Sequence, residues 1–502
     1  MNKTLYTFIL VTLIAALESA KYEPNWSSID SRPLPLWYDD VKFGIFSHWG
    51  VYSVPAFRSE WLWYYWRAQN NTDVVNYLDK HFHGQSYADF APQFTAEDLD
   101  PAQFADIVAA SGAKYFVLTS KHHEGFTLWP SDTSFNWNAV DVGPKRDLVG
   151  TLKEAFNKTD VHFGLYFSLM DWFQPLFLSD NSNNKTEFVE QVSYLQLLEI
   201  TSKYEPEIIW SDGDWDRSPE YWKSKEFLTW LYNESPVKDK VVVNDRWGRG
   251  TMGHHGGYLT YSDHYDPGQL LQRKWENCMT LDKESWGYRR NMKASDVHTV
   301  KEVLDQLVRA ISCNGNLLLN IGPDRFGRIV PIFEDRLRGI GKFIKANSVA
   351  VYGTKPWIHQ NDTNTWYTSS VRNDAGLDPR RIFNPQDQEN TIIYAWIFDI
   401  PDNGTVNLPS VKPTDKTNVT VLGTTISVAH SPVGTGISVD LHALPFQKLP
   451  STDVIILKIE YAATSHHNPL KPAHHHNQSR NQKKKLKKLL KDYLRSNQYN
   501  RH

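Results

Sequence analysis

Carboxyl-bearing side chains follow several hydrophobic runs in the first two thirds of the chain. Asp212 ends one such run and stands between two tryptophans, Trp210 and Trp215, while Asp263 and Glu276 lie beyond later runs. Two carboxyl groups of this kind can serve as a nucleophile and as a proton donor, the pair of roles that cleavage of a glycosidic bond requires. Tryptophans around the reacting carbon would exclude water and strengthen electrostatic effects there.

The residue types alone leave both roles open. Asp214 and Asp216 lie close enough in sequence to compete with Asp212 for the first role. Asp263 and Glu276 are alternatives for the second, and nothing in their local sequence separates them.

The His122-His123 pair raises the question of a metal site. Adjacent residues on a strand point to opposite sides, which makes the pair awkward as joint ligands. No Cys or carboxylate cluster has zinc-like spacing, and residues 320–323 lack the glycines and the lysine of a phosphate loop. The sequence therefore predicts neither a metal nor a cofactor.

The elements that must position these side chains alternate between short β-branched or aromatic runs and amphipathic helical stretches. We expect strands at residues 41–49, 114–123, 161–172, 206–215, 240–247, 258–265 and 316–323. We expect helices at residues 101–111, 147–156, 187–203, 297–312 and 333–346, the first with Asp100 as N-cap and Pro101 at its first position. This α/β pattern predicts a TIM-type (β/α)8-like barrel.

Polar or aromatic residues end nearly every expected strand: His48, His122, His123, Asp171, Asp212, Asn244, Asp263 and Asn320. In a β/α barrel the carboxyl ends of the strands share one face, where active sites lie. The sequence therefore places a site at that face.

Beyond about residue 356 the helical period gives way to short alternating runs broken by Gly, Pro and Asn. These runs, at residues 390–400, 405–411, 418–430, 436–444 and 453–462, predict an antiparallel β-sandwich. The domain prediction is a signal peptide at 1–20, a catalytic barrel at 21–355, a β-sandwich at 356–463 and a basic tail at 464–502. The tail could fold as an amphipathic helix on an anionic surface, or remain a solvated extension.

Export from the cell is indicated by the apolar N-terminal run and by many Asn-X-Ser/Thr sequons. The sequon asparagines are Asn25, Asn70, Asn157, Asn184, Asn233, Asn361, Asn403, Asn418 and Asn477. Only two cysteines are present, which excludes a disulfide scaffold, and we expect free thiols. The formal net charge is −3 although the tail is strongly basic, so the rest of the chain is acidic and nucleic acid is not an expected partner.

Several long motifs resemble the α-L-fucosidases of glycoside hydrolase family 29. They occupy residues 42–50, 59–66, 120–131, 164–173, 208–215, 242–248, 274–278, 285–290 and 316–323, in the family's order. The resemblance extends from about residue 22 to 463. It implies a retaining exo-α-L-fucosidase that acts on fucosylated glycans, is exported to the lysosome or the extracellular fluid as a glycoprotein, and forms homo-oligomers.

The resemblance also assigns roles to residues. Asp212 matches the family nucleophile, although Asp214 stands where animal enzymes often have Glu. Asp263 is the first choice for the acid/base, with Glu276 as the alternative; a buried ion pair would equally explain Glu276. The residues that match the fucose pocket are His48, Glu60, Trp61, His122, His123, Tyr166, Arg246 and Trp286, with Phe167 as an alternative to Tyr166.

Two other functions remain open from the sequence. A fucose-binding lectin-like protein could keep the pocket without turnover. A hydrolase for another sugar would prefer a galactoside, because D-galactose and L-fucose share a hydroxyl arrangement.

Overall fold

The computed structural model describes residues 21–183, 185–372, 390–449, 451 and 453–462. The predicted signal peptide and basic tail lie outside the described residues. The chain divides into two compact units. The first contains the described residues up to Tyr265 together with Glu276–Thr299 and Leu318–Lys342, and the second contains Asp266–Trp275, Val300–Leu317 and the described residues from Phe343 onward. The boundary at residue 355 stays a prediction.

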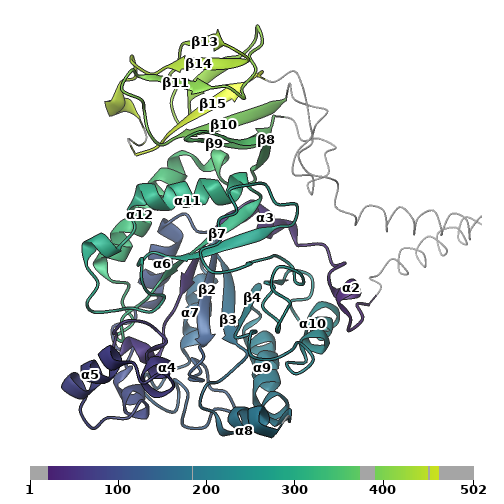
Figure 1. Ribbon diagram of the computed structural model, residues 1–502, viewed down its shortest axis with the longest axis vertical. Helices are drawn as coiled ribbons and strands as arrows, with labels where there is room; N and C mark the ends of the chain where they lie inside the picture. The colour runs from purple at the N-terminus through teal and green to yellow at the C-terminus, as the bar shows by residue number, and fades with distance from the viewer. Residues whose placement is uncertain (1–20, 184, 373–389, 450, 452, 463–502) are drawn as a thin grey trace, which may run out of the picture. The chain divides into compact units, whose positions relative to one another are not determined.

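A seven-stranded sheet forms the β/α barrel, in the order β5-β4-β3-β2-β1-β7-β6. Figure 1 labels β2, β3, β4 and β7 of this sheet. Its strands are β1 (Phe43–Ser47), β2 (Tyr115–Lys121), β3 (His162–Ser168), β4 (Ile208–Asp212), β5 (Val242–Val243), β6 (Trp275–Thr280) and β7 (Gly315–Ile321). β1 to β5 pair in parallel. Parallel pairing requires a crossover between strands, which explains the alternation of runs and helices in the sequence.

The strands β1, β2 and β4 are buried along their whole length, which explains the hydrophobic runs with which they begin. Towards the barrel interior, β2 contributes Val117 to a core cluster that also contains Leu318 of β7. On its other face, Phe116 stacks on Phe156 at 4.3 Å and meets Phe104 edge-on at 5.7 Å. These two rings belong to α7 and α6, so the helices cover the outer face of the sheet.

An irregular segment lies between β5 and β6. The amides of Gly257 and Tyr258 donate to the carbonyl oxygen of Val243, and the amide of Glu276 donates to that of Leu259. The prediction of a strand at 258–265 is wrong, since only Leu259 pairs. Left-handed backbone at Tyr261 and His264, with φ of 56° and 55°, interrupts the extended chain. The seventh strand of the sheet is instead β6, which we did not predict.

The expected helices are present with small shifts at their ends, except that the one expected at 187–203 begins with a π-helical segment, η3 (Val189–Ser193), which α9 continues. The helices are α2 (Trp26–Ile29), α3 (Leu36–Val41), α4 (Leu62–Arg67), α5 (Thr72–His81), α6 (Pro101–Ala110), α7 (Leu148–Phe156), α8 (Pro175–Asn183), α9 (Tyr194–Tyr204), α10 (Ser224–Asn233), α11 (Val300–Ser312) and α12 (Pro331–Ala346). The N-cap prediction is confirmed, because the Asp100 side chain accepts from the amides of Ala102 and Gln103. Within the described part of the chain, no helix combines the length and apolar character needed to cross a membrane.

The second unit contains α11 and an antiparallel β-sandwich of two sheets, ordered β12-β15-β10-β9-β8 and β11-β14-β13. The strands are β8 (Lys355–Asp362), β9 (Thr365–Val371), β10 (Thr391–Ile397), β11 (Thr405–Leu408), β12 (Asn418–Val421), β13 (His430–Val433), β14 (Gly436–Asp440) and β15 (Ile455–Glu460). Alternate residues of both sheets form one core that includes Trp357, Ile393, Ile437 and Leu457. The predicted sandwich is confirmed, although β8, β9 and β13 were not predicted.

Candidate active site

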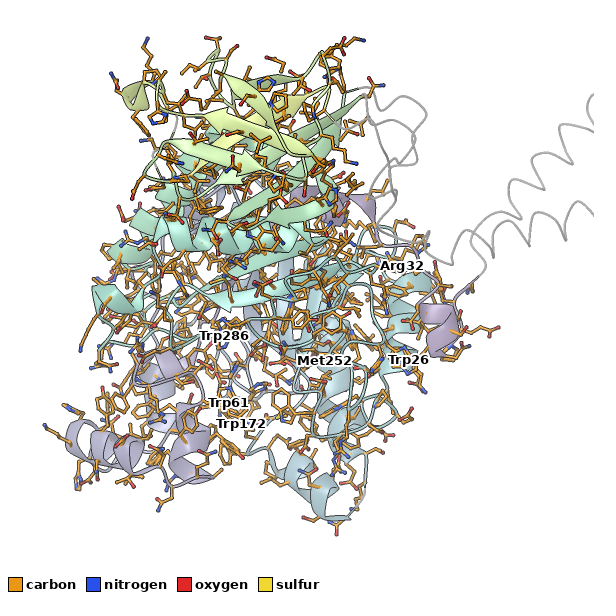
Figure 2. The ribbon with its side chains drawn as sticks, turned by 45° about the horizontal axis from the view of Figure 1, so that its top comes forward. Trp26, Arg32, Trp61, Trp172, Met252 and Trp286 are labelled. Carbon is orange, nitrogen blue, oxygen red and sulfur yellow. The ribbon has the colours of Figure 1, made fainter. Side chains whose placement is uncertain are left out.

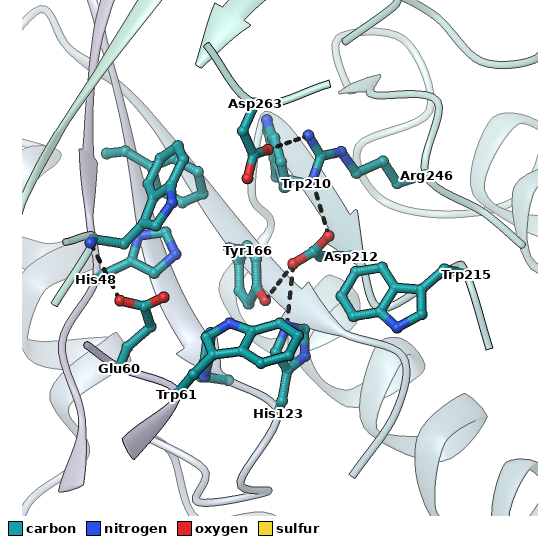
Figure 3. Close-up of a pocket in the computed structure, with 13 residues that line it drawn as sticks. His48, Glu60, Trp61, His123, Tyr166, Trp210, Asp212, Trp215, Arg246 and Asp263 are labelled. Atoms are coloured by element: carbon teal, nitrogen blue, oxygen red, sulfur yellow. Dashed lines mark hydrogen bonds and ion pairs between the residues drawn. The ribbon is translucent and has the colours of Figure 1, made fainter. Parts of the chain in front are cut away.

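A pocket of about 280 Å³ lies at the carboxyl ends of the barrel strands (Figure 3). Its lining brings together Asp212, Asp263 and all eight predicted sugar-binding residues. The lining residues are Phe46, His48, Glu60, Trp61, His122, His123, Tyr166, Trp210, Asp212, Trp215, Arg246, Asp263 and Trp286. The volume is near the lower end for small-molecule sites, which suits a single sugar ring.

Asp212 is the last residue of β4 and is almost fully buried. Its Oδ2 accepts the hydroxyl of Tyr166 at 2.8 Å and lies 3.4 Å from His123 Nε2, and its Oδ1 accepts Arg246 Nη1 at 3.1 Å. Burial is the largest influence and raises the pKa of Asp212, but the His123 hydrogen bond, the Arg246 charge and the Tyr166 hydrogen bond together lower that pKa well below its usual range. Asp212 is therefore ionised, as a nucleophile must be.

One guanidinium group holds two carboxylates in the pocket (Figure 3). Arg246 donates through Nη1 to Asp212 and through Nη2 to Asp263 Oδ1 at 2.5 Å, while its Nε donates to Thr260 Oγ1 at 3.1 Å. Its guanidinium carbon lies 4.6 Å from the ring centre of Trp210. The Asp263 side chain is 46 % exposed, so solvent and a leaving group can reach it.

Glu276, the alternative acid/base, does not line the pocket. It is fully buried on β6. Its Oε2 accepts the hydroxyls of Tyr38 at 2.6 Å and Tyr115 at 2.7 Å, and its Oε1 accepts Trp210 Nε1 at 2.9 Å. Its partners are thus two tyrosines and a tryptophan.

The tautomer of His48 follows from its neighbours. Asn320 donates its amide nitrogen to the carbonyl oxygen of Trp286 at 2.6 Å, so Asn320 Oδ1 is the atom that accepts from His48 Nδ1 at 2.7 Å. Burial, with the nearby His122, lowers the pKa of His48 to about 3. His48 is therefore neutral, and its Nε2 is an acceptor available to a hydroxyl group of a ligand.

His122 and His123 both line the pocket, with ring centres 4.2 Å apart. The expectation that they point to opposite sides is wrong, because β2 ends at Lys121 and the pair follows it outside the strand. His122 Nδ1 pairs with Glu124 Oε2 at 3.0 Å. His123 Nδ1 donates to Ser168 Oγ at 2.7 Å, since the Ser168 hydroxyl itself donates to a backbone carbonyl oxygen.

Glu60 and Trp61 precede α4 and form the opposite wall from Asp263 (Figure 3). Glu60 Oε2 accepts the amides of Trp286 at 3.2 Å and Gly287 at 3.1 Å. Burial raises the pKa of Glu60. These hydrogen bonds lower it, but burial has the larger effect. Trp61 and Trp286 both belong to the first unit and are labelled in Figure 2.

The choice between Tyr166 and Phe167 is decided by position. Tyr166 lines the pocket, whereas the ring of Phe167 lies under the Lys121 ammonium group at 4.2 Å. Successive strand residues face opposite sides, so only one of the two could reach the site.

Three aromatic lining residues were not among the predicted sugar contacts: Phe46, Trp210 and Trp215. Phe46 and Trp210 stand two residues before His48 and Asp212, so the two-residue period of a strand could have identified them. Trp215 follows a turn at Gly213, whose φ of 77° is in the left-handed region.

Among the residues that the structure describes, no group of three or more His, Cys, Asp or Glu side chains is arranged to hold a metal ion. The expectation of no metal and no cofactor stays a prediction. Cys278 and Cys313 are both buried free thiols.

A β/α barrel with carboxylates, histidines and tryptophans around one small pocket at its strand ends is the architecture of a glycoside hydrolase. Comparisons with known proteins give the family. A family described as α-L-fucosidase matches residues 9–349, and its C-terminal domain matches residues 360–460. The chain belongs to the α-L-fucosidase family, glycoside hydrolase family 29, and is an α-L-fucosidase of the animal type.

Individual relatives agree with this assignment. The tissue α-L-fucosidase of Homo sapiens is 47% identical over 428 residues, which cover 83% of this chain and 88% of that protein. The plasma α-L-fucosidase of Rattus norvegicus is 54% identical over 368 residues, covering 72% and 80%. The Thermotoga maritima α-fucosidase, solved with a mechanism-based inhibitor, is 29% identical with a TM-score of 0.73, covering 88% of this chain and 100% of that one.

Proposed function

We propose that this α-L-fucosidase removes terminal α-L-fucose from glycans by a retaining double displacement, with Asp212 as nucleophile and Asp263 as acid/base. One observation carries the proposal: a buried Asp212 and an accessible Asp263 line the same pocket and share the guanidinium group of Arg246. Retention requires two carboxyl groups close enough to act on one anomeric carbon in turn.

In the first step, Asp212 attacks the anomeric carbon and forms an ester bond to it. The bond from that carbon to the leaving oxygen breaks, and Asp263 transfers its proton to this oxygen. Asp212 loses its negative charge as the ester forms. Arg246 then stabilises the Asp263 carboxylate that the proton transfer leaves.

In the second step, Asp263 accepts a proton from a water molecule whose oxygen attacks the anomeric carbon. The ester bond to Asp212 breaks and its carboxylate returns, while Asp263 is again protonated. The product keeps the α configuration because the carbon is inverted twice.

The remaining lining residues bind the sugar ring. Neutral His48 accepts a hydrogen bond from a sugar hydroxyl through Nε2, and Glu60 and His122 offer further polar atoms to the ring hydroxyls. The aromatic part of the wall, including Phe46 and Trp286, receives the C5 methyl group.

Azide separates the two carboxyl roles. Asp212→Gly should lower hydrolysis of 4-nitrophenyl α-L-fucoside by about 10⁴-fold, while fucose still binds. Added azide should then give the β-fucosyl azide, because azide enters from the side that Asp212 occupied. Asp263→Ala with azide should give the α-fucosyl azide, because azide attacks the covalent intermediate.

The coupling between H1 and H2 in the proton NMR spectrum distinguishes the two azides. Near-normal activity of Asp212→Gly would refute the nucleophile assignment, and binding of fucose without turnover by the unsubstituted protein would indicate the lectin-like alternative. A β anomer as the first product of the unsubstituted enzyme would refute retention.

We propose that the protein is exported to the lysosome or the extracellular fluid and carries N-glycans. Among the described residues, six sequon asparagines are exposed: Asn25, Asn70, Asn157, Asn361, Asn403 and Asn418. Asn233 differs, because its amide nitrogen donates to the carbonyl oxygen of Tyr22 at 2.9 Å and its Oδ1 accepts the Tyr22 amide. Mass spectrometry of peptides after glycan release should therefore find Asn233 unmodified.

Homo-oligomer formation and contact of the basic tail with an anionic surface are further proposals. Light scattering of the purified protein tests the first. Binding to anionic vesicles with and without residues 464–502 tests the second.

A further inference from the structure

Glu276 is a fully buried carboxyl group that the proposed mechanism does not use. It accepts three hydrogen bonds below the pocket, one of them from Trp210, whose ring forms part of the pocket wall. We propose that Glu276 is a positioning residue: it fixes the Trp210 ring on which the Arg246 guanidinium lies, and so sets the arrangement of the two reacting carboxylates. This role rests on the proposed function of those carboxylates.

The contact between Glu276 and Trp210 has a fixed direction. The indole N–H of Trp210 can only donate. The hydroxyls of Tyr38 and Tyr115 both contact Oε2, at 2.6 and 2.7 Å. Burial raises the pKa of Glu276 and the three hydrogen bonds lower it, and Oε1 can accept from Trp210 whether the carboxyl group is ionised or carries a proton on Oε2.

Trp210 transmits this arrangement to the reacting groups. Its ring centre lies 4.6 Å from the guanidinium carbon of Arg246 and stacks near-parallel on Tyr166, at 5.8 Å and 21°. A guanidinium group that lies on an aromatic face takes its orientation from that face. Both Asp212 and Asp263 are bound by the terminal nitrogens of this one group, so a tilt of the indole would move their shared partner.

The packing around Glu276 leaves space for the side chains that donate hydrogen bonds to it. A Cβ atom on Gly44 of β1 would lie 2.4 Å from the Tyr115 ring, so only glycine lets that ring occupy the space through which its hydroxyl reaches Glu276. Tyr38 approaches from α3, Tyr115 from β2 and Trp210 from β4, so three separate elements converge on the carboxyl group that β6 carries. The same enclosure separates Glu276 from any leaving group, in contrast to Asp263.

The test compares Glu276→Gln with Asp180→Asn. Asp180 is a matched control because it is also fully buried and accepts three hydrogen bonds, from the amides of Glu187 and Phe188 and the hydroxyl of Tyr221, but does not line the pocket. Both variants should unfold at lower urea concentration. Per folded molecule, Glu276→Gln should lower kcat/KM by about 10- to 100-fold, and Asp180→Asn should not.

Two readouts distinguish positioning from proton transfer. The loss in Glu276→Gln should be the same factor for 4-nitrophenyl α-L-fucoside and for a fucosyl disaccharide with a poor leaving group, and azide should not restore activity. A loss of kcat/KM confined to the disaccharide, together with a kcat for the 4-nitrophenyl substrate that azide raises, would show that Glu276 is the acid. An unchanged kcat/KM per folded molecule would show that it is structural only.

Trp210→Phe provides a second route if Glu276→Gln does not fold, because it keeps an aromatic face while it removes the N–H donor together with the five-membered ring that carries it. It should produce the same leaving-group-independent loss. In the double variant the loss should be no larger than the greater single loss, since both changes break one link; additive losses would overturn the proposal. These outcomes are independent of the azide products of Asp212→Gly and Asp263→Ala, which test the proposed function itself.

Discussion

The buried carboxyl group of Asp214 makes the free energy of unfolding depend on pH, and substitution of this residue should remove that dependence. It is 3% exposed, and its Oδ1 has no hydrogen-bond partner among the described residues. Burial, and next the negative charge of Asp212, raise the pKa of Asp214 from 3.8 to about 7. We therefore expect Asp214→Asn, which places a neutral group of the same shape at this position, to stabilise the protein at neutral pH.

The sign follows from proton binding. Between pH 4 and 7 the folded protein keeps a proton on Asp214 that the unfolded chain has released, so the free energy of unfolding falls as the pH rises. The fall is about 1.4 kcal/mol per pH unit for one group. With the pKa raised from 3.8 to about 7, the stability present below pH 4 decreases by roughly 4 kcal/mol by pH 7.

Urea unfolding at pH 4.5 and pH 7.5 measures the effect. At pH 4.5 the two proteins should differ by less than about 1 kcal/mol, because Asp214 is protonated in one and amidated in the other. At pH 7.5 the variant should be more stable by several kcal/mol. Asp216→Asn is the control, since it makes the same substitution two residues away at a side chain that is 39% exposed.

Equal stability of the variant and the unsubstituted protein at pH 7.5 would refute this reasoning, because it would mean that the folded protein holds Asp214 ionised at no cost. Burial also raises the pKa of Glu124 to about 8 and of Asp171 to about 6. These two groups act with the same sign as Asp214, whereas the lowered pKa values of Asp212 and His48 act with the opposite sign.

Two further predictions concern single contacts. Arg246→Lys should lower kcat/KM for 4-nitrophenyl α-L-fucoside by at least about 100-fold, because one ammonium group cannot reproduce the planar pair of donors that holds two carboxylates; activity within threefold of the unsubstituted enzyme would contradict the bridging role. Asp100→Ala should lower the free energy of unfolding by about 1 kcal/mol through loss of the α6 cap, and should leave kcat/KM unchanged; urea titration and steady-state kinetics check both, and an unaltered unfolding midpoint would contradict the cap's contribution.

The barrel and the position of its site were predictable because they depend on local patterns. Hydrophobic runs buried on both faces, helix caps such as Asp100 and polar residues at strand ends are all visible along the chain. The failures lie where local pattern and pairing disagree. Residues 258–265 read as a strand, but left-handed backbone at Tyr261 and His264 leaves only Leu259 paired, and β6 was passed over because its residues, WENCMT, lack β-branched side chains before the last.

The sequence by itself determined which residue types could react and, through its motifs, which family they belong to. It did not separate Asp263 from Glu276, because both follow hydrophobic segments and differ only in their surroundings. Tertiary structure distinguished those surroundings: the fold leaves Asp263 accessible beside Arg246 and encloses Glu276 among Tyr38, Tyr115 and Trp210. The chemistry available to a carboxyl group depends on the donors, charges and solvent around it, and these come from segments far apart in the chain.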